Sequence, residues 1–356
     1  MRYLLGDYTT EGGPGLVAAG PDGLGEPAMV VNPSWVHVGP EAVYTLTETE
    51  PGFAGAWRIG DDFALDRAGQ GRSTGGNNPC HATVDPSGRW LLVANYGAGD
   101  GSGASVAVLP IGEDGTLGEA ADEFRLSGTG PHPDRQTGPH AHQVVCHDSR
   151  VLVVDLGSDR IHALDLGEDG KLTPAATTQL EPGFGPRHLA FVGDRAVIAG
   201  ELANAFAVGS WDSRAATFSF GPAVPLPSGE AVDYAAMPDI GLDEAAPEAL
   251  PAAVVPDPER GLVYITVRGP DQLAVVDPAA SALVRSVPVG GAWPRDAVLT
   301  ADGTLLVACQ HSGTVTRVDP TGEKPPVTEW SVPGVTCVAP LSRKLPTLQN
   351  FTSGIL

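Results

Sequence analysis

Leu91-Leu92-Val93-Ala94-Asn95-Tyr96 is one copy of a short apolar phrase that ends at a polar or small residue and recurs along the chain. Aligned on Asn95, the seven copies have their equivalent positions at residues 7, 47, 95, 155, 200, 267 and 309, so that successive copies lie 40, 48, 60, 45, 67 and 42 residues apart. A period in the forties with occasional insertions is typical of four-stranded blades arranged around an axis. The repeat therefore predicts an all-β, seven-bladed β-propeller that occupies residues 1–356 as a single domain.

A second phrase, a Pro-containing turn followed by a short strand, precedes most copies of the first. Examples are Pro79-Cys80-His81, Pro186-Arg187-His188 and Pro294-Arg295-Asp296. The first copy has no such strand before it, and we expect the C-terminal segment Val335–Ala339 to complete its blade and close the ring. A set of β-sandwiches is the alternative fold, but it does not explain seven copies in one register.

Composition excludes several function classes. The formal net charge of −22 argues against nucleic-acid binding, which needs a basic stripe. No run of eighteen apolar residues could span a membrane, and the N-terminus becomes polar too early for a signal peptide. The four cysteines show no C-x-x-C spacing, which indicates free thiols in a reducing compartment. We therefore expect a cytoplasmic protein. As to assembly, we expect a monomer or a weak homo-oligomer.

The two phrases also predict a site, because the start of the innermost strand and the end of the next strand meet at one end of a propeller channel. Basic, imidazole and carboxylate side chains gather at these positions, although packing alone would select similar apolar residues in every blade. The candidates from the two positions are His81, His140, His142, Arg187, His188 and Arg295 at the strand starts and Tyr96, Glu201, Arg268 and Gln310 after the strand ends.

Each candidate also has a structural interpretation. A histidine at a strand start is more often a hydrogen-bonded structural residue, and Glu201 could simply pair with Arg187. His140 and His142 could be metal ligands, but no third ligand with suitable spacing accompanies them, so we expect neither a metal nor a cofactor. The acidic segment 228–251 accounts for the longest spacing and reads as a solvated insertion.

These phrases resemble the seven-bladed propeller lactonase family, whose activities include 6-phosphogluconolactonase and carboxymuconate cyclisation. The resemblance rests on motifs such as Gly6-Asp7-Tyr8-Thr9, Arg135-Gln136-x-Gly-Pro-His140-Ala-His142 and Gly185-Pro186-Arg187-His188, in order along the whole chain. It implies a catalytic or binding set of His142, Arg187, Glu201 and Arg268. The chain departs from the family pattern at Gly200, Ala253 and Val267.

The resemblance implies metal-independent hydrolysis of a small anionic sugar-acid lactone, with 6-phosphogluconolactone as the expected substrate in carbohydrate metabolism. Glu201 or His142 would deprotonate water, Arg187 would stabilise the oxyanion, and Arg268 and Arg295 would hold the substrate's anionic group. His81, His140, His188, Tyr96 and Gln310 would add binding contacts. Two alternatives stay open at this point: a cyclase that forms a lactone from a carboxylated muconate, and a non-catalytic propeller scaffold that binds a protein.

Overall fold

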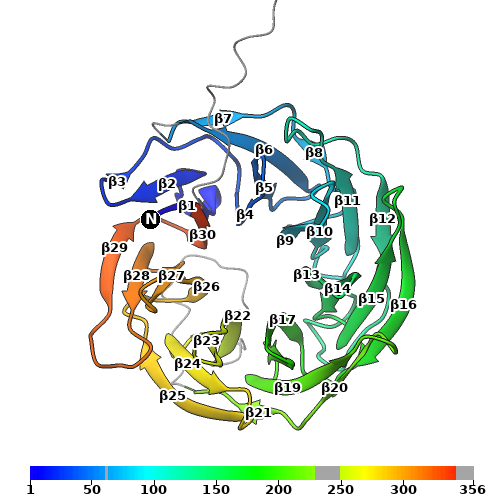
Figure 1. Cartoon of the computed structure of the whole chain (residues 1–356), viewed down its shortest axis with the longest axis vertical. Coiled ribbons are helices and arrows are strands. Elements are labelled where there is room, and N and C mark those ends of the chain that lie inside the picture. The colour runs from blue at the N-terminus through cyan, green and yellow to red at the C-terminus, as the bar shows by residue number, and fades with distance from the viewer. Residues whose placement is uncertain (61–62, 229–248, 342–356) are drawn as a thin grey trace, which may run out of the picture.

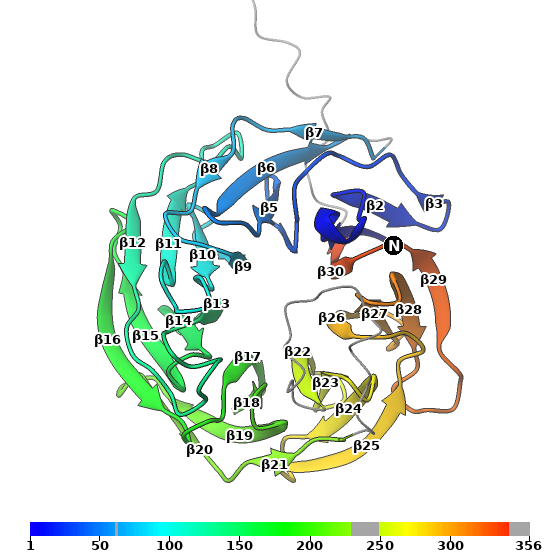
Figure 2. The ribbon, with the colours of Figure 1, turned by 180° about the vertical axis from the view of Figure 1, so that it is seen from behind.

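Seven antiparallel sheets surround a central channel in the computed structural model, which describes residues 1–60, 63–228 and 249–341 (Figure 1). The described part of the predicted insertion 228–251 is confined to its ends, because residues 229–248 lie outside the described residues. The prediction of a seven-bladed β-propeller is confirmed. The reverse view shows the same ring from its other face (Figure 2).

Each blade runs outward from an innermost strand. The strands of blades 2 to 4 are β4 (Trp35–Val38), β5 (Val43–Thr47), β6 (Phe53–Ile59), β7 (Leu65–Arg67) and β8 (Arg72–Ser73); β9 (Pro79–Val84), β10 (Trp90–Asn95), β11 (Ser105–Pro110) and β12 (Asp122–Arg125); and β13 (Ala141–His147), β14 (Arg150–Asp155), β15 (Arg160–Leu166) and β16 (Leu172–Gln179).

Blades 5 to 7 repeat the pattern. Their strands are β17 (Pro186–Val192), β18 (Arg195–Gly200), β19 (Ala205–Asp212), β20 (Thr217–Phe220) and β21 (Val224–Pro225); β22 (Leu250–Asp257), β23 (Leu262–Arg268), β24 (Gln272–Asp277) and β25 (Ala282–Pro288); and β26 (Pro294–Leu299), β27 (Leu305–Cys309), β28 (Thr314–Val318) and β29 (Val327–Ser331).

Blade 1 closes the ring with both ends of the described chain. Its strands are β30 (Val335–Leu341), β1 (Arg2–Asp7), β2 (Val17–Gly20) and β3 (Gly23–Leu24), and the 3₁₀ turn η1 (Thr9–Glu11) follows β1. β30 pairs antiparallel with β1 from Arg2↔Leu341 to Asp7↔Val335. The prediction that the C-terminal segment completes the first blade is confirmed.

Apolar runs form the second strand of each blade because both of its faces are covered by neighbouring blades. In β10, Leu91, Leu92, Val93 and Ala94 are all fully buried, which a strand with one solvated face would not allow. Seven hydrophobic clusters fill the seven contacts between adjacent blades. The cluster at the closure joins Leu5 of β1 to Leu306 of β27 and Val338 of β30. The fold is therefore held by a ring of equivalent cores.

A β-bulge recurs in the innermost strand and positions side chains at the channel. Pairing between the two inner strands shifts register near Cys80, His142, Arg187 and Arg295, so that the inner strand carries one extra residue at each place. Such a bulge breaks the alternation of the strand and re-aims a side chain. The shift falls at the start of the strand in each case, at the same end of the channel.

We predict that Leu5→Ala lowers the free energy of unfolding by about 2–5 kcal/mol, because it leaves a cavity in the cluster that closes the ring. Urea denaturation followed by far-UV circular dichroism measures the change. Val327→Ala is the control, since Val327 is 57% exposed on the outer strand β29. A loss below about 1 kcal/mol for Leu5→Ala would show that this contact does not hold the ring closed.

Candidate active site

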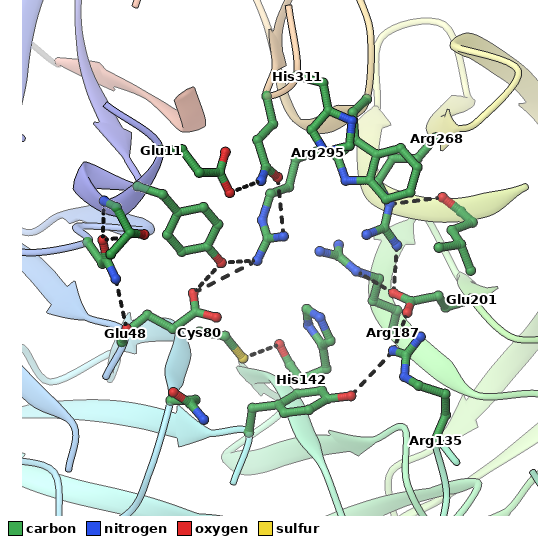
Figure 3. Close-up of a pocket in the computed structure, with 18 residues that line it drawn as sticks. Glu11, Glu48, Cys80, Arg135, His142, Arg187, Glu201, Arg268, Arg295 and His311 are labelled. Carbon is green, nitrogen blue, oxygen red and sulfur yellow. Dashed lines mark hydrogen bonds and ion pairs between the residues drawn. The ribbon is translucent and has the colours of Figure 1, made fainter. Parts of the chain in front are cut away.

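A polar cavity of about 500 Å³ opens at the end of the channel where the bulges lie (Figure 3). Six of its lining residues lie at the end of the second strand in six blades. Tyr8, Glu48, Tyr96, Glu201 and Gln310 directly follow that strand, and Arg268 is its last residue. Four more are the residues at the bulges, namely Cys80, His142, Arg187 and Arg295. The two repeated phrases therefore supply most of the lining.

Glu201 lies at the centre of a cluster of three arginines. Its Oε1 accepts a hydrogen bond from Arg135 Nη2 at 2.7 Å, and its Oε2 accepts one from Arg268 Nη2 at 2.7 Å. Arg187 Nε lies 3.0 Å from the same Oε2, but its N–H does not point at that oxygen, so this contact is an ion pair rather than a directed hydrogen bond. The side chains of Glu201, Arg187 and Arg268 are each at most 6% exposed.

The arginines set the protonation state of Glu201. Burial alone would raise the pKa of its carboxyl group, but Arg268, Arg135 and Arg187 outweigh burial and hold the pKa well below its usual range. Burial and the adjacent Arg268 lower the pKa of Arg187, the least well paired of the three cations. Glu201 is therefore an anion whose oxygens are both engaged, which makes it a poor acceptor for a water proton.

His142 offers the better proton acceptor in the cavity. Its side chain lines the cavity and is buried. Burial, reinforced by Arg187 and Arg295, lowers the pKa of the imidazole well below its usual range, so the ring is neutral at pH 7. A neutral imidazole at the cavity wall can take a proton without first losing one.

A second polar network forms the wall that faces the arginine cluster. Tyr8 Oη donates to Glu48 Oε2 at 2.9 Å, and Arg295 Nη2 donates to Tyr8 Oη at 2.6 Å. Gln310 Nε2 donates to Glu11 Oε1 at 2.8 Å, while its Oε1 lies 3.4 Å from Arg295 Nη1. Arg295 therefore contacts both the Tyr8–Glu48 pair and the Gln310–Glu11 pair. The network joins blade 1 to blades 2 and 7.

Trp293 supports the arginine cluster from the rim. Its ring stacks on His311 with centroids 4.5 Å apart, and the Arg268 guanidinium carbon lies 5.2 Å from the Trp293 centroid. Trp293 has a φ of 63°, which a bulky residue adopts only when its surroundings impose it. Its backbone N–H donates to the Asp271 carboxylate at 2.8 Å, and this bond holds the turn.

Seven of the ten residues that the sequence singled out line the cavity: His142, Arg187, Glu201, Arg268, Arg295, Tyr96 and Gln310. His81, His140 and His188 do not. His81 stacks on Trp35 with centroids 4.1 Å apart, and the His188 ring lies 5.4 Å from that of His142. His140 stacks on Tyr96, and its Nδ1 lies 3.0 Å from the Tyr96 carbonyl oxygen. His140 and His188 therefore contact lining residues, whereas His81 packs against Trp35, which does not line the cavity.

Arg135 is the main lining residue that sequence reasoning did not assign to the site. It lies in the loop before β13, outside both repeated phrases, so the repeat register could not select it. The adjacent Gln136 is buried and donates to the Leu156 carbonyl and to Asp159 Oδ1, at 2.8 Å each, which anchors the loop. The sequence feature that could have identified Arg135 is its place at the start of the motif Arg135-Gln136-x-Gly-Pro-His140-Ala-His142. Tyr8 and Glu48 were visible in the register after the strand ends but were not assigned either.

No group of three or more His, Cys, Asp or Glu side chains in residues 1–60, 63–228 and 249–341 is arranged to hold a metal ion. In the same described ranges, no helix is long and apolar enough to cross a membrane.

Comparison with known proteins adds a family. The family model described as "Lactonase, 7-bladed beta-propeller" matches residues 22–340. A protein named 6-phosphogluconolactonase from Bacillus subtilis (strain 168) is 28% identical over 333 residues, which cover 88% of this chain and 89% of that protein. A crystal structure of a Lactobacillus plantarum protein superposes with a TM-score of 0.81 at 26% identity, covering 96% of this chain and 99% of that one.

A second crystal structure, of a putative 6-phosphogluconolactonase from Bacteroides uniformis, superposes with a TM-score of 0.77 at 25% identity and covers 95% of this chain and 98% of that one. The periplasmic gluconolactonase PpgL of Pseudomonas aeruginosa, with a TM-score of 0.78 at 24% identity over 95% of this chain and 98% of that one, shares the fold.

We predict that Glu201→Gln lowers the free energy of unfolding by about 3–5 kcal/mol at pH 7, because it leaves buried arginines without their counter-charge. Denaturation by urea, which is uncharged and does not screen the ion pairs, measures the loss. Glu113→Gln, on an exposed turn, is the matched control. The same loss in both variants would contradict a special role for the Glu201 charge.

The Glu201 contribution should also depend on pH. The pKa of Glu201 is lower in the folded protein than in the unfolded chain, where it is about 4.3, so its stabilisation is fully present above that value. The contribution declines as the pH falls below about 4 towards the folded pKa. The stability difference between the parent and Glu201→Gln should therefore narrow in acid, and a difference that widened there would contradict the ion-pair interpretation.

Proposed function

Because the chain belongs to the seven-bladed β-propeller lactonase family, we propose that it hydrolyses the lactone of a sugar acid, with 6-phosphogluconolactone as its substrate. The observation that carries the proposal is the cluster of buried Arg187, buried Arg268 and half-buried Arg135 around Glu201 in a chain whose net charge is −22. So many cations gathered in one cavity of an acidic protein suit an anionic substrate and an anionic transition state.

Hydrolysis of a lactone begins when water attacks the carbonyl carbon and loses a proton. We assign the proton to His142, because its imidazole is neutral and Glu201 is engaged by three arginines. The attack converts the carbonyl into a tetrahedral oxyanion. When the bond between that carbon and the ring oxygen then breaks, protonated His142 can return the proton to the leaving oxygen, so the histidine ends as it began.

Arg187 is the donor that we assign to the oxyanion. Its guanidinium group lines the cavity with His142 and carries five N–H donors, so we assign one of its terminal N–H groups to the position where negative charge develops. Arg268 and Arg135 each give one N–H to Glu201 and retain others for the phosphate. Arg295, which the sequence assigned to the anionic group together with Arg268, donates instead to Tyr8 and lies 3.8 Å from Glu48, so we give the phosphate to Arg135 in its place. In this arrangement Glu201 is a positioning residue that keeps three cations together.

The two alternatives fit the cavity less well. A scaffold that binds a protein would be expected to present apolar anchors, whereas four arginines and three glutamates line this cavity. A muconate cyclase would bring several carboxylates into a cavity where Glu11 and Glu48 form one wall. Loss of phosphogluconolactone against loss of muconate absorbance separates the two enzyme activities directly.

We keep the cytoplasm as the proposed compartment. Cys80, Cys146, Cys309 and Cys337 are all free thiols, which suits a reducing environment, and a phosphorylated sugar acid is an intracellular kind of metabolite.

We predict that Arg187→Ala lowers kcat/KM for 6-phosphogluconolactone about 10²–10³-fold, the effect of losing one oxyanion donor. The loss should fall mainly on kcat, because the oxyanion exists only in the transition state. A pH-stat assay, corrected for spontaneous hydrolysis of the lactone, measures it. Arg285→Ala on the exposed face of β25 is the control. If Arg187→Ala turned over at the parent rate, the assignment of the oxyanion donor would be wrong.

His142 should set the acid limb of the pH–rate profile. Its pKa is lowered by burial and by Arg187 and Arg295, so the base form persists into acid and the limb should lie below pH 6.5 rather than at it. His142→Asn should lower kcat by about 10²-fold and abolish the limb. A variant with lowered kcat but an unchanged acid limb would assign the proton transfer to another group.

A further inference from the structure

We propose that the wall formed by Tyr8, Glu11, Glu48 and Gln310 recognises the hydroxyl groups of the substrate, so that the enzyme is specific for a polyhydroxylated lactone held with its anionic edge towards Glu201. The inference rests on the proposed function and goes beyond it by assigning a second set of contacts and an orientation.

The wall presents hydrogen-bond acceptors that the protein leaves unused. Tyr8 and Arg295 engage only Oε2 of Glu48, and Gln310 engages only Oε1 of Glu11. In the part of the chain that the structure describes, the other oxygen of each carboxylate has no protein partner, and both residues line the cavity. Because an ionised carboxylate accepts hydrogen bonds and cannot donate them, these oxygens suit hydroxyl groups.

Charge divides the cavity into two unlike ends. Around Glu201, three arginines leave a net charge of about +2, whereas Arg295 with Glu48 and Glu11 gives about −1 when both carboxyls are ionised. A phosphate or carboxylate group is attracted to the first end and repelled from the second. A ligand with one anionic edge and one hydroxyl-bearing edge therefore has a single favoured orientation.

A six-membered sugar lactone has these two edges. The carbonyl carbon and the carbon that carries the phosphorylated methylene both adjoin the ring oxygen, so the reacting carbonyl and the phosphate share one edge. The three ring hydroxyls occupy the opposite edge. Placing the first edge at Arg187 and Arg268 brings the carbonyl to the oxyanion donor, and the hydroxyls then face Glu48 and Glu11.

Direct binding of two product-like ligands tests the proposal without requiring turnover. The ligands are 6-phosphogluconate and 6-phosphooxyhexanoate, which have the same two anionic ends and differ only in their hydroxyl groups. We expect calorimetry to show that the parent protein binds the hydroxylated ligand at least tenfold more tightly, since a site built for hydroxyls leaves polar groups unpaired without them.

Glu48→Ala should reduce that preference at least fivefold. Glu11→Ala should also reduce it. Because the Glu11 side chain is exposed on η1, this second variant should fold even if Glu48→Ala does not. Glu113→Ala is the matched control and should keep the parent ratio. The proposal is overturned if the parent shows no preference, or if Glu48→Ala and Glu11→Ala weaken both ligands equally. A hydroxyl preference in a protein that hydrolyses no lactone would instead refute the proposed function alone.

Discussion

One carboxylate makes the candidate active site possible. Three guanidinium groups cannot share a buried cavity without an anion between them, because like charges in a poorly solvated space repel strongly. Glu201 supplies that anion and contacts all three arginines. In this arrangement the arginines occupy both carboxylate oxygens of Glu201. Its low pKa removes it from acid–base chemistry and directs attention to the neutral His142.

The propeller brings these groups together through its irregularities rather than through its regular strands. Regular pairing would turn successive side chains of the innermost strand alternately towards the two neighbouring blades. The bulges interrupt that alternation at Cys80, His142, Arg187 and Arg295, and each of these side chains lines the cavity. Because the interruption recurs at one end of the ring, chemically unlike residues from four blades converge on one small volume.

The repeat predicted the fold because its apolar core is a local pattern, which each blade carries in its own sequence. Residues after the second strand were predictable for the same reason: Glu201, Arg268 and Gln310 occupy one register position. The inner strand was harder. A bulge changes which of two adjacent residues faces the channel, so Cys80 and Arg187 line the cavity where the sequence also selected His81 and His188. Arg135 lies in a loop with no repeat to align it, and only three-dimensional folding brings it to Glu201.

The contact between Glu11 and Gln310 spans 299 residues, and that between Tyr8 and Arg295 spans 287. Both contacts depend on the antiparallel pairing of β1 with β30, the first and last strands that the structure describes. During synthesis on the ribosome, the arginine cluster can assemble when blade 6 has folded, but the facing wall must wait until blade 7 docks against blade 1. A chain that still lacks blade 7 therefore contains the residues of the arginine cluster but not Arg295 and Gln310, which complete the facing wall.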